Sequence, residues 1–193
     1  MEKKEITKEK KQIITIDVNN TSQSIFYYLN HNYAYVKLQQ QICYYKGCKF
    51  EANEIINGIY LGNIESSYDK DMLKKLNITS IISVLYGYNP PYKEDFDYLV
   101  INALDSSDTN LYMVFDLCCE FINKVFEDKG NLLIHCMAGR SRSVTILAAY
   151  LIKNFGISDE SAIDLIKSKR PIIGINDGFR QQLNKYYKYV NNL

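Results

Sequence analysis

The chain has 193 residues, 47% of them hydrophobic, which is enough for one domain of ordinary size with an extension. Its formal net charge of +1 gives no general attraction to nucleic acid or to an anionic membrane surface, and no apolar run approaches membrane-spanning length. The five cysteines are an odd number and no secretory leader precedes them, which argues against a disulfide framework. We therefore expect a protein of the cytoplasm, the nucleus or both, with neither nucleic acid nor a membrane as partner.

Residues 1–51 are expected to form an N-terminal extension that is partly flexible. Its first dozen residues are rich in Lys and Glu, whereas residues 24–50 are dense in aromatic side chains, which disordered segments lack. Residues 8–16, with three lysines before Ile14-Thr15-Ile16, resemble a kinase-docking peptide, although a solvated tail is the favoured interpretation. A zinc site is disfavoured because four ligands at the usual spacing are absent; the available side chains are His31, Cys43 and Cys48.

Residues 52–193 are predicted to fold as a single domain in which strands alternate with helices. A short hairpin is expected at Asn57-Gly58, which separate two short apolar runs. Continuous β-branched and apolar runs predict buried strands at residues 78–85, 97–103 and 131–135. The spacing of apolar residues and the capping residues predict helices at residues 66–76, 110–126, 142–154, 159–170 and 177–190. This alternation favours an α/β fold with a mostly parallel central sheet of about five strands flanked by helices.

The last of these strands leads into a segment at the start of a predicted helix, His135-Cys136-Met137-Ala138-Gly139-Arg140-Ser141-Arg142-Ser143. A helix N-terminus attracts anions through its unpaired N–H groups, and the five residues between Cys136 and Arg142 can turn their N–H groups inward. The guanidinium fork of Arg142 can hold two phosphate oxygens, and the same positive field lowers the pKa of the Cys136 thiol. The pattern indicates a phosphate-binding loop with a nucleophilic cysteine, rather than a structural cysteine beside a surface arginine.

We call residues 136–142 the phosphate loop. The residues expected to bind the substrate phosphate are Met137, Ala138, Gly139, Arg140, Ser141 and Arg142. Because the backbone amides and the guanidinium supply the charge stabilisation, we expect neither a metal nor another cofactor. Attack by Cys136 also requires an acid that protonates the leaving oxygen, and with only two histidines in the chain a carboxylate is the natural candidate.

The nine residues from His135 to Ser143 resemble the active-site signature of the dual-specificity protein phosphatases, His-Cys-x-Ala-Gly-x-Ser-Arg-Ser. The resemblance covers about residues 52–190 and includes residues 54–62, residues 76–84 and an Asn-x-x-Phe-x-x-Gln-Leu pattern that begins at Asn176. The chain departs from the family pattern at Ile175, where many members have Pro. The resemblance implies a cysteine-phosphatase fold and hydrolysis of phosphotyrosine and phosphoserine or phosphothreonine through a cysteinyl-phosphate intermediate.

The resemblance also implies roles for single residues. Asp105, which lies 31 residues before Cys136, matches the general acid of the family, and Asp108 is the alternative on the same loop. Ser143 matches the hydroxyl that assists departure of the thiolate. His135 matches the residue that supports the loop and tunes the thiolate, and Asn176 matches the amide that hydrogen-bonds the phosphate loop.

The expected partner is a phosphoprotein substrate, and a protein kinase is one option. A phosphatase for lipid, RNA or glucan phosphates shares all of this chemistry and stays an alternative, whereas a non-catalytic phosphate-binding module is disfavoured because nucleophile and acid are both present. Cys118 lies on the apolar stripe of its helix, which predicts a core position. A disulfide between Cys136 and Cys118 or Cys119 under oxidation is the other interpretation of this pair.

Overall fold

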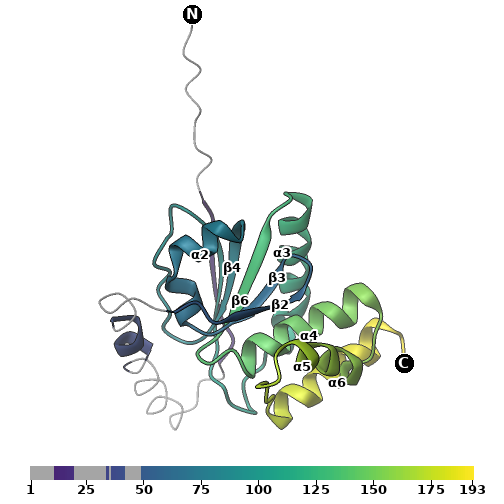
Figure 1. Ribbon diagram of the computed structural model, residues 1–193. Coiled ribbons are helices and arrows are strands. Elements are labelled where there is room, and N and C mark those ends of the chain that lie inside the picture. Colours follow the sequence, from purple (N-terminus) through teal and green to yellow (C-terminus); the bar gives the residue numbers. More distant parts are fainter. Residues whose placement is uncertain (1–10, 20–33, 35, 42–48) are drawn as a thin grey trace, which may run out of the picture.

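A six-stranded sheet forms the centre of the computed structural model, in which we describe residues 11–19, 34, 36–41 and 49–193 (Figure 1). Its strands are, in chain order, β1 (Ile13–Asp17), β2 (Ala52–Ile56), β3 (Ile59–Gly62), β4 (Ile78–Val84), β5 (Asp97–Asn102) and β6 (Asn131–His135). They lie in the order β1-β5-β4-β6-β3-β2, and among these described strands only β2 runs antiparallel to its neighbour. The predicted α/β fold with a mostly parallel sheet is confirmed, with six strands where about five were expected.

Helices cover both faces of this sheet (Figure 1). They are, in chain order, η1 (Glu65–Tyr68), α2 (Lys70–Lys75), η2 (Tyr112–Val114), α3 (Phe115–Glu127), α4 (Arg142–Phe155), α5 (Asp159–Lys169) and α6 (Asp177–Val190). Successive strand residues point to opposite faces, so Ile82 and Leu99 enter the larger core with α3 to α6. Their neighbours Ile81 and Tyr98 enter the smaller core with α2. Burial on both faces explains the continuous apolar runs of these strands.

The helix α4 is the element that places the phosphate loop. All of its residues from Ser143 to Ile152 are buried, because α3, α5 and α6 pack around it and the sheet lies on its remaining side. It ends at Gly156, whose φ of +66° is a left-handed cap that glycine adopts without strain. Its N-terminus follows the carboxyl end of β6, where ligands bind in parallel sheets of this kind.

Two predicted helices are divided in the structure. The segment 66–76 consists of η1 and α2, which Asp69 separates by accepting a hydrogen bond from the Met72 backbone N–H as the cap of α2. The segment 110–126 begins with the short helix η2 before α3 starts at Phe115. The predicted hairpin is confirmed as β2 and β3, with Gly58 at a φ of +81° between them.

The strand β1 lies in the segment that the sequence assigned to a solvated tail, and that expectation is wrong for residues 13–17. They pair with β5 in parallel register, from Ile13 opposite Tyr98 to Asp17 opposite Asn102. Val18, the next residue, is buried in the larger core. The sheet therefore takes its sixth strand from the N-terminal extension, and the Ile13 and Ile14 side chains stay exposed on this edge strand. The kinase-docking interpretation stays a prediction.

Several expectations fall on residues outside the described part of the chain. These are the lysines Lys8 and Lys10, the disfavoured zinc ligands His31, Cys43 and Cys48, and most of the aromatic-rich stretch. Among the described residues, no helix has both the length and the apolar composition that crossing a membrane requires.

Candidate active site

The phosphate loop leaves β6 at Cys136 and enters α4 at Arg142. Its backbone carbonyls point outward to fixed donors: Met137 O accepts from the Ile64 N–H at 3.1 Å, and Arg140 O accepts from the Gly174 N–H at 2.8 Å. Gly139 has a φ of +63°, and a Cβ at this position would lie 2.5 Å from the carbonyl oxygen of Gly62. Glycine is therefore required here both by the backbone conformation and by the close approach of β3.

Cys136 is the candidate nucleophile and the first residue of this loop. Its side chain is only 2% exposed, and its sulfur accepts a hydrogen bond from the Ser143 hydroxyl at 3.2 Å. Burial alone would raise the pKa of this thiol, but the charge of Arg142, the Ser143 hydroxyl and the backbone N–H groups of Ser143 and Arg140 outweigh it. The net result is a pKa below that of an ordinary cysteine, which favours the nucleophilic thiolate.

Arg142 lies beside the loop with its guanidinium mostly buried. Nη1 donates to the carbonyl of Ala103 at 3.0 Å, and Nε lies 3.4 Å from a carboxylate oxygen of Asp105. That second contact is an ion pair without hydrogen-bond geometry, so Nε is a buried donor that forms no hydrogen bond. An N–H group in this state provides a donor for an oxyanion in the loop.

Asp105 is brought to the phosphate loop, as the sequence predicted. Its Oδ1 accepts hydrogen bonds from the Ser141 hydroxyl at 2.7 Å and from the Asn176 amide at 3.1 Å. Its side chain is 37% exposed, so a substrate can reach it. Asp108 is also exposed, but its backbone N–H, and not its carboxylate, forms the hydrogen bond to the Ser106 hydroxyl. The geometry favours Asp105 over Asp108 as the candidate acid.

The hydrogen bonds of Asn176 differ from those expected. Its Oδ1 accepts from the Phe179 N–H and so caps α6, and its Nδ2 donates to Asp105. The expected contact with the phosphate loop is therefore replaced by one with the candidate acid. The cap fixes the side chain at the start of α6, from which the amide nitrogen reaches the Asp105 carboxylate.

His135 supports the loop from inside the protein. Its Nε2 lies 2.7 Å from the Ser83 hydroxyl and its Nδ1 lies 3.3 Å from the carbonyl oxygen of Cys136. Burial lowers the pKa of His135 to about 4, so the ring is neutral near pH 7. In the tautomer that fits both contacts, Nδ1–H donates to Cys136 O and Nε2 accepts from Ser83.

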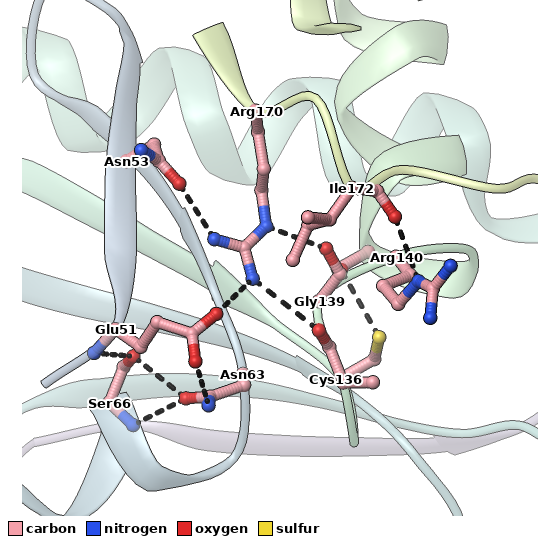
Figure 2. A network of polar contacts seen from close by, with 11 residues as sticks. Glu51, Asn53, Asn63, Ser66, Cys136, Gly139, Arg140, Arg170 and Ile172 are labelled. Carbon is pink, nitrogen blue, oxygen red and sulfur yellow. Dashed lines mark hydrogen bonds and ion pairs between the residues drawn. The ribbon is translucent and has the colours of Figure 1, made fainter. Parts of the chain in front are cut away.

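Arg170 is a site residue that the sequence did not identify (Figure 2). It is only 2% exposed, and its guanidinium donates to the carbonyls of Gly139 at 2.8 Å and Ala138 at 3.4 Å. Its two remaining partners precede β3 in the chain: Glu51 at 3.0 Å and Asn53 at 2.7 Å. An arginine at the end of a helix usually interacts with solvent and the helix dipole, so the local pattern gave no signal of its burial.

The Gly139 carbonyl links Arg170 to the candidate nucleophile Cys136. The C=O and N–H of one peptide unit point in opposite directions, so a carbonyl directed at Arg170 turns the N–H of Arg140 toward the loop centre. That N–H is one of the donors that lower the pKa of Cys136. Figure 2 shows the chain of contacts from Glu51 through Arg170 and the loop to Cys136.

The other described cysteines are buried in the core, as predicted for Cys118. Cys118 and Cys119 are free thiols, and burial raises the pKa of Cys119 to about 11 and that of Cys118 well above its usual value. Neither is activated in the way Cys136 is. In the described part of the chain, no group of three His, Cys, Asp or Glu side chains is placed to hold a metal ion.

Comparison with known proteins identifies the family. Residues 59–189 match the family model described as the dual specificity phosphatase catalytic domain. The chain belongs to the dual-specificity phosphatase family. This phosphatase, a phosphoric monoester hydrolase, is 42% identical over 134 residues to dual specificity protein phosphatase 1 of Arabidopsis thaliana, covering 69% of this chain and 68% of that one. It is 39% identical over 140 residues to dual specificity protein phosphatase 1B of the same plant, covering 72% of this chain and 84% of the relative.

Solved structures give the same family for the phosphatase. The human tyrosine phosphatase-like serine/threonine/tyrosine-interacting protein has a TM-score of 0.71 at 30% identity, covering 75% of this chain and all 100% of that one. The structure of DUSP15 has a TM-score of 0.67 at 33% identity, covering 75% of this chain and 97% of that one. The predicted cysteine-phosphatase fold is confirmed. The family match begins at β3, so β1, Glu51 and Asn53 all precede it.

Proposed function

We propose that this dual-specificity protein phosphatase hydrolyses phosphotyrosine and phosphoserine or phosphothreonine with Cys136 as its nucleophile. The Cys136 sulfur forms a bond to phosphorus while the bond to the leaving oxygen breaks, and Asp105 transfers a proton to that oxygen. The Arg142 guanidinium and the loop N–H groups, from Met137 to Ser141, hold the phosphoryl oxygens. The observation that carries the proposal is a buried thiol with a lowered pKa at a helix N-terminus, beside an arginine and a carboxylic acid.

The second step returns the enzyme to its starting state. Asp105, now ionised, accepts a proton from a water molecule that attacks phosphorus, and the sulfur–phosphorus bond breaks. The hydrogen bond from the Ser143 hydroxyl stabilises the departing thiolate.

Two variants of the acid loop test the assignment of the proton donor. We expect Asp105→Asn to slow phenyl phosphate, which has a poor leaving group, by about 10²-fold or more, while a difluorinated umbelliferyl phosphate with a good leaving group changes little. Asp108→Asn should change neither rate. If instead Asp108→Asn produces the dependence on the leaving group and Asp105→Asn does not, Asp108 is the acid.

The substrate class follows from the relatives, which are named as protein phosphatases and do not favour the lipid, RNA or glucan alternative. A panel of phosphotyrosine and phosphothreonine peptides, phosphoinositides and RNA 5′-phosphates, with vanadate as inhibitor, tests it. We expect turnover of both phosphopeptides; strict preference for a non-protein ester would contradict the proposal.

We also propose a protein kinase as one class of phosphoprotein bound at this site, and the cytoplasm or nucleus as the location. The kinase would bind as substrate, through its phosphorylated residue, because the phosphate loop and Arg142 contact the phosphate ester itself. The location is supported by the chemistry of the nucleophile, since an activated thiolate requires a reducing compartment to stay active. We expect the chain lacking residues 1–10 to dephosphorylate a phosphorylated kinase as fast as the full chain does, which checks that the kinase binds as a substrate.

A further inference from the structure

The loop that carries Asp105 is fixed at its far end by α6. We call residues 103–111 the acid loop. The Gln182 side chain accepts from the Tyr112 N–H and donates to Thr109 O, each at 2.9 Å. Gly178 lets the loop approach closely, because a Cβ there would lie 2.2 Å from the carbonyl oxygen of Ser107. These contacts come from residues within the family match.

The near end of the acid loop is fixed by the N-terminal extension instead. The Asn19 side chain accepts a hydrogen bond from the backbone N–H of Leu104 at 3.0 Å and donates one to the carbonyl of Asn102 at 2.9 Å. Leu104 is the residue directly before Asp105, and it is buried. The Asn19 side chain is itself held by Asp17, whose carboxylate accepts from Nδ2 at 3.0 Å.

The position of Asn19 follows from the pairing of β1 with β5. The last paired residues are Asp17 and Asn102, and the Val18 N–H still donates to Asn102 O at 3.2 Å. Beyond this point the side-chain amide of Asn19 supplies one donor and one acceptor, the same groups that a peptide unit contributes to a parallel ladder. The Asn19 side chain thus extends the β1–β5 hydrogen-bond pattern to Leu104, near the start of the acid loop.

We propose that Asn19 is a positioning residue for the general acid, so that the N-terminal extension is part of the catalytic apparatus. Asn19 fixes the backbone at Leu104, and the neighbouring Ala103 carbonyl receives the hydrogen bond from Arg142. Together these contacts fix the backbone directly before Asp105, and so they set where its carboxylate meets Ser141 and Asn176. This inference rests on the proposed role of Asp105 as the proton donor.

The test uses the full chain with Asn19→Leu, which keeps the size of the side chain and removes its hydrogen bonds to Leu104 and Asn102, together with the one to Asp17. We expect kcat/KM for phenyl phosphate to fall by about fivefold to 100-fold, because a small displacement of a catalytic group costs rates of this order. The difluorinated umbelliferyl phosphate and vanadate affinity should change less than about twofold, since the phosphate loop is untouched. Should Asn19→Leu fail to fold, Asn19→Ala carries the same test.

Two controls separate positioning from general damage. Asn154→Leu removes an equivalent amide contact, to Asn123 on an exposed helix surface, and should leave both substrates unchanged. In the Asp105→Asn background, Asn19→Leu should have no further effect on phenyl phosphate, because two residues that act through one group are not additive.

The outcomes distinguish the two proposals. Equal losses for both aryl phosphates, or an undiminished effect of Asn19→Leu in the Asp105→Asn background, would overturn the role of Asn19 alone. An Asp105→Asn variant without any dependence on the leaving group would overturn the acid assignment and the positioning role together.

Discussion

Arg170→Met should lower the free energy of unfolding by an amount that follows from the contacts of the guanidinium. The Met side chain preserves much of the apolar packing, so the main loss is the four hydrogen bonds of the guanidinium. The Gly139 carbonyl is buried and would be left unpaired, at about 2 kcal/mol. The acceptors on Ala138, Glu51 and Asn53 belong to exposed residues that water can pair, so together they add about 1 kcal/mol.

The expected total is a loss of about 3 kcal/mol in the free energy of unfolding, or a fall in Tm of about 6–12 °C for a chain of this size. Urea and thermal unfolding measure this directly. The substitution should also raise the pKa of Cys136, because the Gly139–Arg140 peptide is no longer held with its N–H toward the sulfur. The pH dependence of iodoacetamide alkylation reports that shift.

Two further variants serve as controls for Arg170→Met. Arg180→Met changes an exposed arginine on α6 and should alter neither stability nor alkylation. Glu51→Gln keeps an oxygen acceptor at a side chain that is 56% exposed, and should cost less than about 1 kcal/mol. An Arg170→Met protein within about 1 kcal/mol of the wild type, with an unshifted alkylation profile, would refute the idea that Arg170 fixes the loop.

Three other predictions concern the same site. Ser143→Ala should raise the pKa of Cys136, seen as an upward shift of the alkylation profile, because it removes a hydrogen bond to the thiolate; an unshifted profile would argue against that bond. Gly139→Ala should destabilise the protein well beyond Gly156→Ala, since both have positive φ but only the first places a Cβ against backbone; equal values from urea unfolding would contradict the contact. His135 should make the protein less stable as pH falls from about 6.5 to about 4, by about 3 kcal/mol in all, because the unfolded chain binds a proton that the buried ring does not; this slope should be absent in His135→Asn, and its persistence would assign it to other groups.

Most of the fold could be predicted because local sequence and tertiary environment agree. The strands β4, β5 and β6 are continuous apolar runs buried on both faces, and Ser158 and Gly156 mark helix ends by capping chemistry that depends only on nearby residues. The strand β1 was missed because a five-residue segment with polar flanks pairs only with β5, whose residues lie 85 positions further along the chain. Periodicity over so short a segment does not distinguish an edge strand from a tail.

The candidate site likewise contains residues that the local sequence indicated and residues that it did not. Cys136 and Arg142 share one loop between a predicted strand and a predicted helix, so that local context indicated the chemistry, whereas Asp105 was implied by the resemblance to the family. Arg170 and Asn19 act through backbone carbonyls and N–H groups of segments distant in the sequence. Their side chains carry no local pattern, because the partner is a peptide unit that every residue possesses. The partner of Asn176 was mistaken for a related reason, since its cap on α6 sets the direction of the amide.

The central claim is that phosphate is transferred to Cys136, and trapping the intermediate tests it most directly. Rapid acid quench of the Asp105→Asn variant with a ³²P-labelled aryl phosphate that has a good leaving group, followed by peptide mapping, locates the label. We predict label on the peptide that contains Cys136, and neither label nor turnover in Cys136→Ser. Label on another residue, or turnover by Cys136→Ser near the wild-type rate, would contradict the account.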